Sequence, residues 1–206
     1  MSNRIAARVR REYEGEAARY DRRWAAYLRG SMELLRPWLE EEPPRTLLDV
    51  GCGTAALLRF LRAWRVEPER YAGLDPSLGM LRRAAGRTGG VVAGAAEALP
   101  FRDGTFDTVV SASAFHYWSD PGAGLAEVRR VLAPGGRVLM VDWSRDFLGM
   151  RVMDAWLRLT GHALVRTYAE REARALMRGA GLRVVRAGRR KIGPVWGLWA
   201  AEARGD

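Results

Sequence analysis

The chain has only one cysteine, Cys52, and only two histidines, His116 and His162. A single cysteine excludes an internal disulfide, and no cluster of residues has the spacing of metal ligands. The sequence also lacks an apolar run long enough for a transmembrane helix, a secretory leader at its start and an internal repeat. We therefore expect a cytoplasmic protein with no membrane span and no metal.

Lysine is as scarce as cysteine: Lys191 is the only one, although the 206-residue chain has a net charge of +10. Arginine therefore carries the excess positive charge, which favours association with nucleic acid or another anionic surface. The basic residues gather in two groups, Arg4, Arg8, Arg10 and Arg11 near the start and Arg186, Arg189, Arg190 and Lys191 near the end. A compositional bias of the source explains the preference for arginine equally well. RNA is thus one alternative substrate, and the oligomeric state is left open.

The most informative segment of the chain is Thr46–Ala55, with the sequence T-L-L-D-V-G-C-G-T-A. Its apolar residues in 47–50 predict a buried parallel strand. The turn Gly51-Cys52-Gly53 follows, and a helical pattern begins at Thr54. A glycine turn between a strand and a helix lets the backbone approach a ligand closely, and the helix N-terminus favours an anionic group. This segment predicts a site for a nucleotide-like cofactor.

Dinucleotide-binding folds also begin with a glycine turn, but the third glycine of their G-x-G-x-x-G signature is missing here. An acidic residue does follow about 20 residues later: the segment Tyr71–Asp75 predicts a second strand with Asp75 at its carboxyl end. A carboxylate there can accept both hydroxyls of a ribose. The alternative is that Asp75 only caps a helix that starts near Pro76.

Predicted strands and helices alternate along the rest of the chain. Apolar runs predict strands at 106–112 and 138–141, and helical spacing predicts a helix over 125–132 between them. Two closing strands are expected at 182–187 and 195–201. This alternation indicates a mostly parallel sheet covered on both faces, so the predicted fold class is α/β, Rossmann-like and doubly wound, in a single domain.

Four blocks of sequence stand out in order, at 47–54, 73–81, 94–111 and 125–137. They contain L-L-D-V-G-C-G-T, then G-L-D-P-S, then G-A-A-E-A-L-P-F leading into F-D-T-V-V-S, and finally L-A-E-V-R-R-V-L-A-P-G-G-R. Together they resemble the motifs of class I S-adenosylmethionine (SAM) dependent methyltransferases, and most of all the quinone-ring and other small-molecule methyltransferases. The resemblance implies a seven-stranded sheet with an antiparallel C-terminal strand. It also implies methyl transfer from SAM, with S-adenosylhomocysteine (SAH) as the product.

The same resemblance implies where the cofactor binds. The glycine turn would contact the amino acid end of SAM. Asp49 would bind the ammonium group of SAM, and Asp75 would bind the ribose. Family members usually have an acidic residue that binds the adenine amino group at the position of Ala95. A SAM-binding protein without catalysis is therefore another alternative. The implied cofactor-binding residues are Tyr20, Asp49, Gly51, Cys52, Gly53, Asp75, Pro76, Met80, Ala95, Ala96, Glu97 and Ser111.

Catalysis by such a site needs few groups, because the sulfonium is already an activated methyl donor. A general base is required only if the acceptor must lose a proton. His116 is the candidate, since it follows the strand at 106–112 and titrates in the right range. The alternative is that the ring of His116 only packs in the site. His162 is expected to be structural.

The two ends of the chain flank a SAM-binding core at 45–145. The first 42 residues are expected to form a helical lid that contains Tyr20, or else an ordinary amphipathic helix packed on the sheet. The segment 146–206 would supply acceptor-side helices and the closing strands. Its Met, Trp and Leu residues either belong to the core or line a pocket for a bulky apolar or aromatic acceptor. A small molecule of that kind is the expected substrate.

Overall fold

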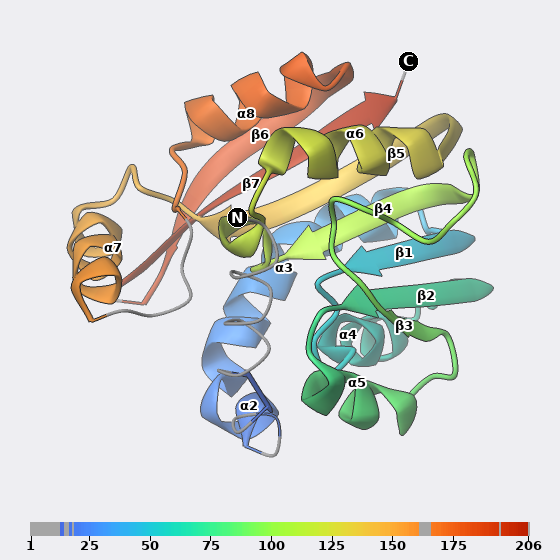
Figure 1. Cartoon of the computed structure of the whole chain (residues 1–206), viewed down its shortest axis with the longest axis horizontal. Helices are drawn as coiled ribbons and strands as arrows, with labels where there is room; N and C mark the ends of the chain where they lie inside the picture. The colour runs from blue at the N-terminus through green and yellow to red at the C-terminus, as the bar shows by residue number, and fades with distance from the viewer. Residues whose placement is uncertain (1–12, 15–16, 18, 161–165, 194, 206) are drawn as a thin grey trace.

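The computed structural model describes residues 13–14, 17, 19–160, 166–193 and 195–205. Within them, seven strands form one sheet in the order β3-β2-β1-β4-β5-β7-β6 (Figure 1). The strands are β1 (Thr46–Val50), β2 (Arg70–Asp75), β3 (Val91–Ala93), β4 (Phe106–Ala112), β5 (Leu132–Trp143), β6 (Leu182–Ile192) and β7 (Trp196–Gly205).

Strand β7 pairs antiparallel with both β5 and β6, whereas the pairs among β1 to β5 are parallel. The predicted doubly wound, Rossmann-like sheet with an antiparallel C-terminal strand is confirmed. The chain leaves β1 and places β2 on one side of it and β4 on the other. This reversal of direction next to β1 is where an open α/β sheet binds its ligand.

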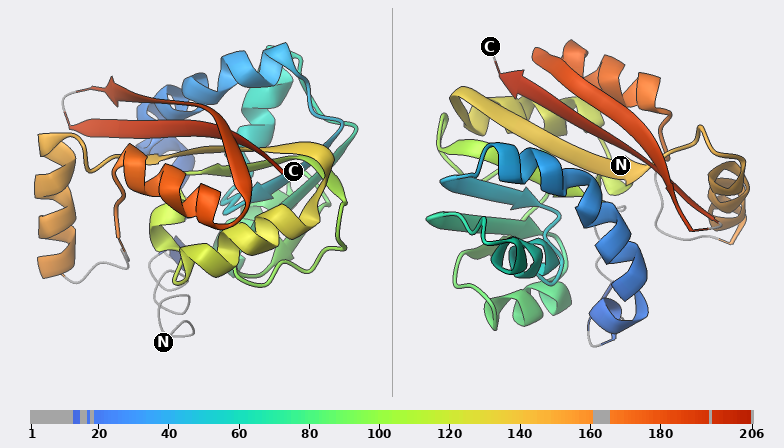
Figure 2. Two further views of the ribbon diagram at one scale, coloured as in Figure 1. Left: turned by 90° about the horizontal axis from the view of Figure 1, so that it is seen from above. Right: turned by 180° about the vertical axis from the view of Figure 1, so that it is seen from behind.

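Helices cover both faces of the sheet, as the two turned views show (Figure 2). They are α2 (Tyr20–Arg23), α3 (Ala25–Glu41), α4 (Ala56–Trp64), α5 (Leu78–Ala85), α6 (Pro121–Val131), α7 (Leu148–Leu159) and α8 (Glu170–Gly179), with the short 3-10 helix η1 (Phe115–Tyr117). Local sequence defines several of their ends. For example, the Asp120 side chain accepts a hydrogen bond from Ala123 N at the start of α6, where Pro121 follows it.

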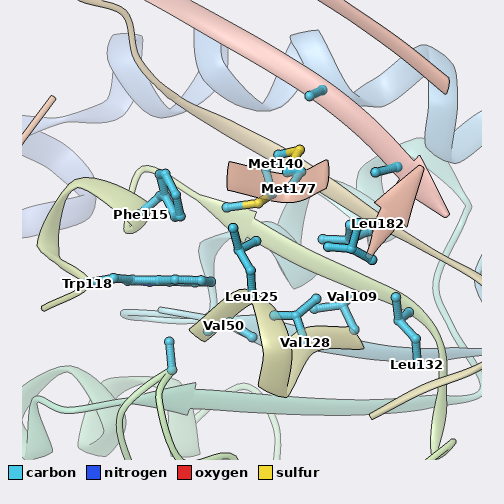
Figure 3. Close-up of a cluster of buried hydrophobic side chains, with 14 of the residues drawn as sticks. Val50, Val109, Phe115, Trp118, Leu125, Val128, Leu132, Met140, Met177 and Leu182 are labelled. Carbon is cyan, nitrogen blue, oxygen red and sulfur yellow. The ribbon is translucent and has the colours of Figure 1, made fainter. Parts of the chain in front are cut away.

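Two buried clusters, one on each face, hold the sheet between the helices. The alternation of side chains along a strand explains the division: Val109 belongs to one cluster and Val110 to the other. The first cluster packs the sheet against α6 and α8, with Leu125, Val128 and Met177 fully buried (Figure 3). The second packs it against α3 and α4. Because helices cover both faces of β1, all five of its residues are buried. A strand of this kind has a nearly continuous apolar sequence.

Helix α3 packs on the sheet as the amphipathic alternative for the N-terminal region predicted. Its residues Leu35 and Leu39 are fully buried in the second cluster, and the helix contacts α4, β5 and β7. Helix α3 continues through Pro37 to Glu41, although a proline normally favours the end of a helix. Burial of leucines on both sides of Pro37 offsets the loss of one backbone hydrogen bond at the proline.

Candidate functional site

A cavity lies at the carboxyl ends of β1, β2 and β4. The glycine turn after β1 forms one wall, the end of β2 another, and residues Ala112, Ser113 and Ala114 at the end of β4 a third. These three segments come from the middle of the sheet, where the order of the strands reverses. The cavity therefore occupies the place where the fold class predicts a ligand.

The glycine turn needs both of its glycines, for different reasons. Gly51 has a φ of +80°, and a Cβ atom there would lie 2.3 Å from the Cβ of Ala114. Its N–H donates to the carbonyl of Leu74 at 2.7 Å, which ties the turn to β2. Gly53 has a φ of +52°, but a Cβ atom there would meet nothing within 4 Å. The backbone at Gly53 is therefore open to a ligand, whereas Gly51 is closely packed.

Ala55 is a feature of the turn that sequence reasoning missed. It precedes α4 with a φ of +57°, a left-handed conformation that costs an alanine roughly 1–2 kcal/mol. Its side chain is fully buried, and its N–H donates to the carbonyl of Cys52 at 2.8 Å. The sequence carried no signal for this conformation, because the third glycine of the dinucleotide signature would fall at residue 56, the first residue of α4.

Two buried carboxyl groups face this cavity. Asp49 is 2% exposed and accepts a hydrogen bond from the hydroxyl of Tyr71 at 2.9 Å. Burial raises the pKa of Asp49 to about 7. Asp75 accepts from Gly53 N at 2.9 Å and from Ser77 N at 2.8 Å, and burial raises its pKa to about 6. Both groups are thus destabilised as anions, and the described lining residues place no arginine or lysine beside them.

The capping alternative for Asp75 is not needed to start α5. Ser77 is the N-cap residue, and its hydroxyl accepts the N–H of Met80 at 3.3 Å. Asp75 instead links the glycine turn to the loop that precedes α5. Its carboxylate therefore stands between two segments that wall the cavity.

The remaining predicted cofactor residues differ in their positions. Pro76, Met80, Ala95, Ala96, Glu97 and Tyr20 all line the cavity. Ser111 does not: its hydroxyl is buried in β4 with no partner among the described residues, while the next three residues of the chain reach the cavity. Cys52 lines the cavity, but burial raises the pKa of its thiol well above the usual range, which does not suit a nucleophile.

Glu97 is engaged in holding a loop. Its Oε1 atom accepts from Ser119 N and Ser119 Oγ, both at 2.7 Å, and from Asp120 N at 3.1 Å. Ala95 offers no polar side chain at the neighbouring position. These contacts give Glu97 a structural role in this loop.

The charge of the cavity is opposite to that of the chain. Asp49, Asp75 and Glu97 line it, and the described lining residues include no arginine and no lysine. A net charge of +10 on the whole chain makes this local excess of carboxyl groups more notable. Such a site suits a ligand that carries positive charge.

The segment around Tyr20 and Asp21 covers the glycine turn. Asp21 accepts a hydrogen bond from Thr54 Oγ1 at 2.6 Å and forms an ion pair with Arg87 at 2.5 Å. These contacts hold Tyr20 against the cavity, and burial raises the pKa of the Tyr20 hydroxyl. Whether this segment moves as a lid stays a prediction.

A second cavity adjoins the first and is largely aromatic. The two share Tyr13, Tyr20, Ser113 and Tyr117 in their linings. The remaining lining residues of the second cavity are Arg23, Trp24, Tyr27, His116, Trp143, Met153, Trp156, Leu157 and Trp196.

A hydrogen-bond chain fixes part of this lining, with Trp143 Nε1 donating to the Tyr27 hydroxyl at 2.8 Å and Tyr27 bonded to Ser113 Oγ at 2.7 Å. The second cavity is suited to a flat apolar molecule.

The segment after β5 divides between core and cavity. Met153, Trp156 and Leu157 of α7 line the second cavity, as the pocket alternative predicted. Met150 is fully buried, and Leu159 is 87% exposed. Helix α7 lies at one end of the molecule beyond β7 (Figures 1 and 2).

His116 borders the second cavity and is 2% exposed. Its Nδ1 atom lies 2.6 Å from Oδ1 of Asp142, and its backbone N–H donates to Oδ2 of Asp142 at 3.1 Å. The imidazole stacks on Trp143 with ring centroids 4.1 Å apart. Sequence reasoning missed Asp142. The signal was its position directly after the apolar run 138–141, because neighbouring parallel strands bring their carboxyl ends together.

The basic clusters are only partly described. Arg4, Arg8, Arg10 and Arg11 lie outside the described residues, as does His162. In the second cluster, Arg186 pairs with Glu41 and Glu202, and Arg189 pairs with Asp146 and Glu170. Part of this positive charge is thus neutralised within the chain, and RNA binding stays a prediction.

The described part of the chain lacks two further features. It contains no group of three His, Cys, Asp or Glu residues that could hold a metal ion. None of its helices is both long enough and apolar enough to cross a membrane.

Comparisons with known proteins agree with the geometry. Residues 48–140 match the family model described as a methyltransferase domain. The chain is 37% identical over 126 residues to a malonyl-acyl-carrier-protein O-methyltransferase of Pseudescherichia vulneris, covering 60% of this chain and 49% of that protein. It is 34% identical over 146 residues to a demethylmenaquinone methyltransferase of Mycolicibacterium vanbaalenii, covering 64% and 58%. The chain thus spans about half the length of these curated relatives.

A solved structure shows the same fold. The Burkholderia thailandensis 1,6-didemethyltoxoflavin-N1-methyltransferase, with bound 1,6-didemethyltoxoflavin and SAH, superposes with a TM-score of 0.75 at 21% identity. The match covers 100% of this chain and 91% of that one.

Proposed function

We propose that the chain is a class I SAM-dependent methyltransferase that transfers a methyl group from SAM to a small apolar or aromatic molecule, since residues 48–140 match the methyltransferase-domain family model. The observation that carries the proposal is the pair of adjoining cavities. One is lined by carboxyl groups and a glycine turn, and the other by aromatic rings. Methyl transfer needs two molecules to meet in line, and the residues shared by the two cavities mark where they would meet.

The first cavity has the groups that SAM requires. Asp49 would hold the ammonium, the open backbone at Gly53 would meet the amino acid end, and Asp75 would accept the ribose hydroxyls. The positive charge of SAM would compensate buried carboxyl groups that have no cationic partner among the described lining residues.

Ala95 supplies no carboxylate for the adenine amino group, so that one contact would be missing, at a cost of ~1 kcal/mol of affinity. Met80, 2% exposed, would still pack against the adenine ring.

SAM supplies an activated methyl group, and the protein's own contribution is position and exclusion of water. Tyr20, held by the contacts of Asp21, lies over the junction of the cavities. Tyr13 and Tyr117 share a hydrogen bond at 2.7 Å beside it. These side chains would keep solvent away from the reacting atoms.

The second cavity would receive the acceptor. Trp143 and Trp196 lie with ring centroids 5.3 Å apart, and Tyr27 meets Trp196 edge to face at 5.1 Å. Rigid aromatic walls favour a flat ring over a flexible chain. The similarity to a demethylmenaquinone methyltransferase supports an acceptor of this class.

The proposal is tested with methyl-labelled SAM and two pools of acceptors, a mixture of small aromatic and apolar compounds and total RNA. We expect label in the small-molecule pool. Label in RNA alone, with binding that weakens steeply as salt rises, would establish the RNA alternative instead. Tight SAM binding without transfer to either pool would favour the non-catalytic alternative.

A further inference from the structure

His116 and Asp142 form a buried pair at the wall of the second cavity. Both side chains are at most 2% exposed, and Nδ1 of the histidine lies 2.6 Å from a carboxylate oxygen of Asp142. The carboxylate also accepts the backbone N–H of His116 at 3.1 Å and that of Trp143 at 2.5 Å. Two backbone N–H groups and the imidazole thus surround the carboxyl group of Asp142, which fixes its position.

This arrangement determines which ring nitrogen carries the proton. A carboxylate only accepts hydrogen bonds, so Nδ1 must donate and Nε2 keeps its lone pair. Nε2 is buried and has no hydrogen-bond partner among the described residues. Nδ1 lies beside Asp142, Trp143 stacks on the imidazole, and His116 belongs to the lining of the second cavity.

An orphaned buried acceptor is costly, so it points to a ligand that supplies the missing donor. The surrounding walls are aromatic, and Tyr117 packs on the imidazole with ring centroids 4.0 Å apart. The missing group is therefore an O–H or N–H on a flat ring.

Building on the proposed function, we infer that the acceptor is a neutral aromatic or heteroaromatic molecule with a dissociable O–H or N–H, that His116 is its general base, and that Asp142 is a positioning residue. The acceptor atom would form a bond to the methyl carbon while the carbon–sulfur bond breaks and its electron pair stays on sulfur. The proton of the acceptor would pass to Nε2, and the resulting imidazolium would be stabilised by the adjacent carboxylate of Asp142.

This inference separates acceptors by their chemistry. A carboxylate, a thioether or a tertiary amine has no proton to lose at neutral pH and would leave Nε2 without a partner. A phenol or a ring N–H would donate a hydrogen bond to Nε2 and would also have a proton to lose during the reaction. An acceptor without such a proton would bind less tightly, because the buried lone pair would stay unsatisfied.

The first test needs no substrate. With only two histidines in the chain, nitrogen NMR of the histidine-labelled full-length protein gives two sets of signals, which the His116→Gln variant assigns. We expect His116 to carry its proton on Nδ1, and Asp142→Asn to move the proton to Nε2, because the amide N–H₂ would donate to Nδ1. A proton on Nε2 in the unaltered protein, or an unchanged spectrum in Asp142→Asn, would overturn the inference.

Asp107→Asn is the matched control for this experiment. Asp107 also accepts backbone N–H groups, from Arg45 at 3.2 Å and Thr46 at 2.9 Å, but it lies near the start of β4, at the opposite end of that strand from His116. The signals of His116 should not change in this variant. If Asp142→Asn does not fold, the tautomer of the unaltered protein still decides the first part of the test.

The second test uses two probes, 2-naphthol and 2-methoxynaphthalene, titrated into the protein saturated with SAH. We expect 2-naphthol to bind about tenfold more tightly, and the preference to vanish in His116→Phe, which keeps a ring on Trp143 but has no nitrogen. Methyl transfer from SAM to 2-naphthol should fall about 100-fold or more in the same variant, with SAM affinity unchanged.

Equal binding of the two probes, or binding of neither, would contradict the substrate class. If His116→Phe does not fold, His116→Gln replaces it in both measurements. A protein that fails to bind SAM and SAH would instead contradict the proposed function, and the two failures are thus distinguishable.

Discussion

Replacing Asp49 with asparagine should change the pH dependence of stability in a defined direction. In the folded protein, burial raises the pKa of Asp49 to about 7 from an ordinary value of 3.8. Between these values the folded state holds a proton that the unfolded chain has released. The free energy of unfolding therefore falls as the pH rises through this range, and the loss is complete above the folded pKa.

The magnitude follows from the width of this range. Each pH unit corresponds to 1.36 kcal/mol, so about two units between pH 5 and pH 7 remove roughly 3 kcal/mol of stability. Asparagine does not titrate, and its buried N–H₂ group without an acceptor costs about 1–3 kcal/mol at every pH. Near pH 5, Asp49→Asn should therefore have a lower free energy of unfolding than the unaltered protein. By about pH 8, the difference between the two proteins should have shifted by roughly 3 kcal/mol in favour of the variant.

The assay is urea unfolding of both proteins at several pH values without ligand, followed by circular dichroism. Asp75, with its pKa raised in the same direction, is present in both proteins, so their difference isolates Asp49. Parallel stability curves would refute the reasoning. Calorimetry on the same variant should show SAM affinity reduced about 10- to 100-fold, because a charged hydrogen bond contributes about 1.5–3 kcal/mol.

Three further predictions concern the walls of the two cavities. Gly53→Ala should lower stability by only about 1–2 kcal/mol, since its Cβ meets no atom, yet abolish SAM binding by filling the cavity; unaltered calorimetric affinity would refute this. Gly51→Ala should be far less stable in thermal unfolding, because its Cβ would lie 2.3 Å from that of Ala114; a melting temperature like that of Gly53→Ala would contradict the packing. Trp196→Ala should weaken binding of 2-naphthol about tenfold or more while SAM affinity stays the same, and equal losses for both ligands would speak against two separate cavities.

The central part of the fold could be predicted because its sequence signals are local. Strand β1 is an apolar run buried on both faces, and the glycine turn that follows it has the conformation its sequence indicates. Strand β3 gave no comparable signal. It has three residues, Val91–Ala93, which are half-buried or exposed, so no apolar pattern distinguishes it from a loop.

The last two strands are longer than the segments 182–187 and 195–201 that the sequence predicts, because part of each strand has no apolar pattern. Strand β6 extends to Ile192, through Arg189, Arg190 and Lys191. These residues are exposed at the edge of the sheet, where β6 pairs only with β7. Their conformation depends on hydrogen bonds to β7 rather than on burial, and sequence polarity alone does not reveal it.

The candidate site also contains some residues that local motifs predict and others that depend on contacts between distant segments. Asp49, Asp75 and the glycine turn follow directly from motifs, and all of them line the first cavity. The pair formed by His116 and Asp142 depends on a contact between residues 26 positions apart. It forms because β4 and β5 pair in register up to their carboxyl ends, with Ala112 opposite Val141.

The aromatic cavity could be predicted least. Trp24, Trp143 and Trp196 come from three distant parts of the chain, and each alone has the pattern of an ordinary core residue. Only the topology, which sets the end of β5 next to the start of β7, brings Trp143 and Trp196 together. Such a site is a property of the assembled sheet.

The most direct measurement is a calorimetric titration of the purified full-length chain with SAM and with SAH at neutral pH, alongside Gly53→Ala. The account predicts saturable micromolar binding of one molecule of either ligand to the unaltered chain, and none to the variant, although its circular dichroism spectrum is native. Absence of binding to the unaltered chain, or equal binding to both proteins, would contradict the assignment of the first cavity as the cofactor site.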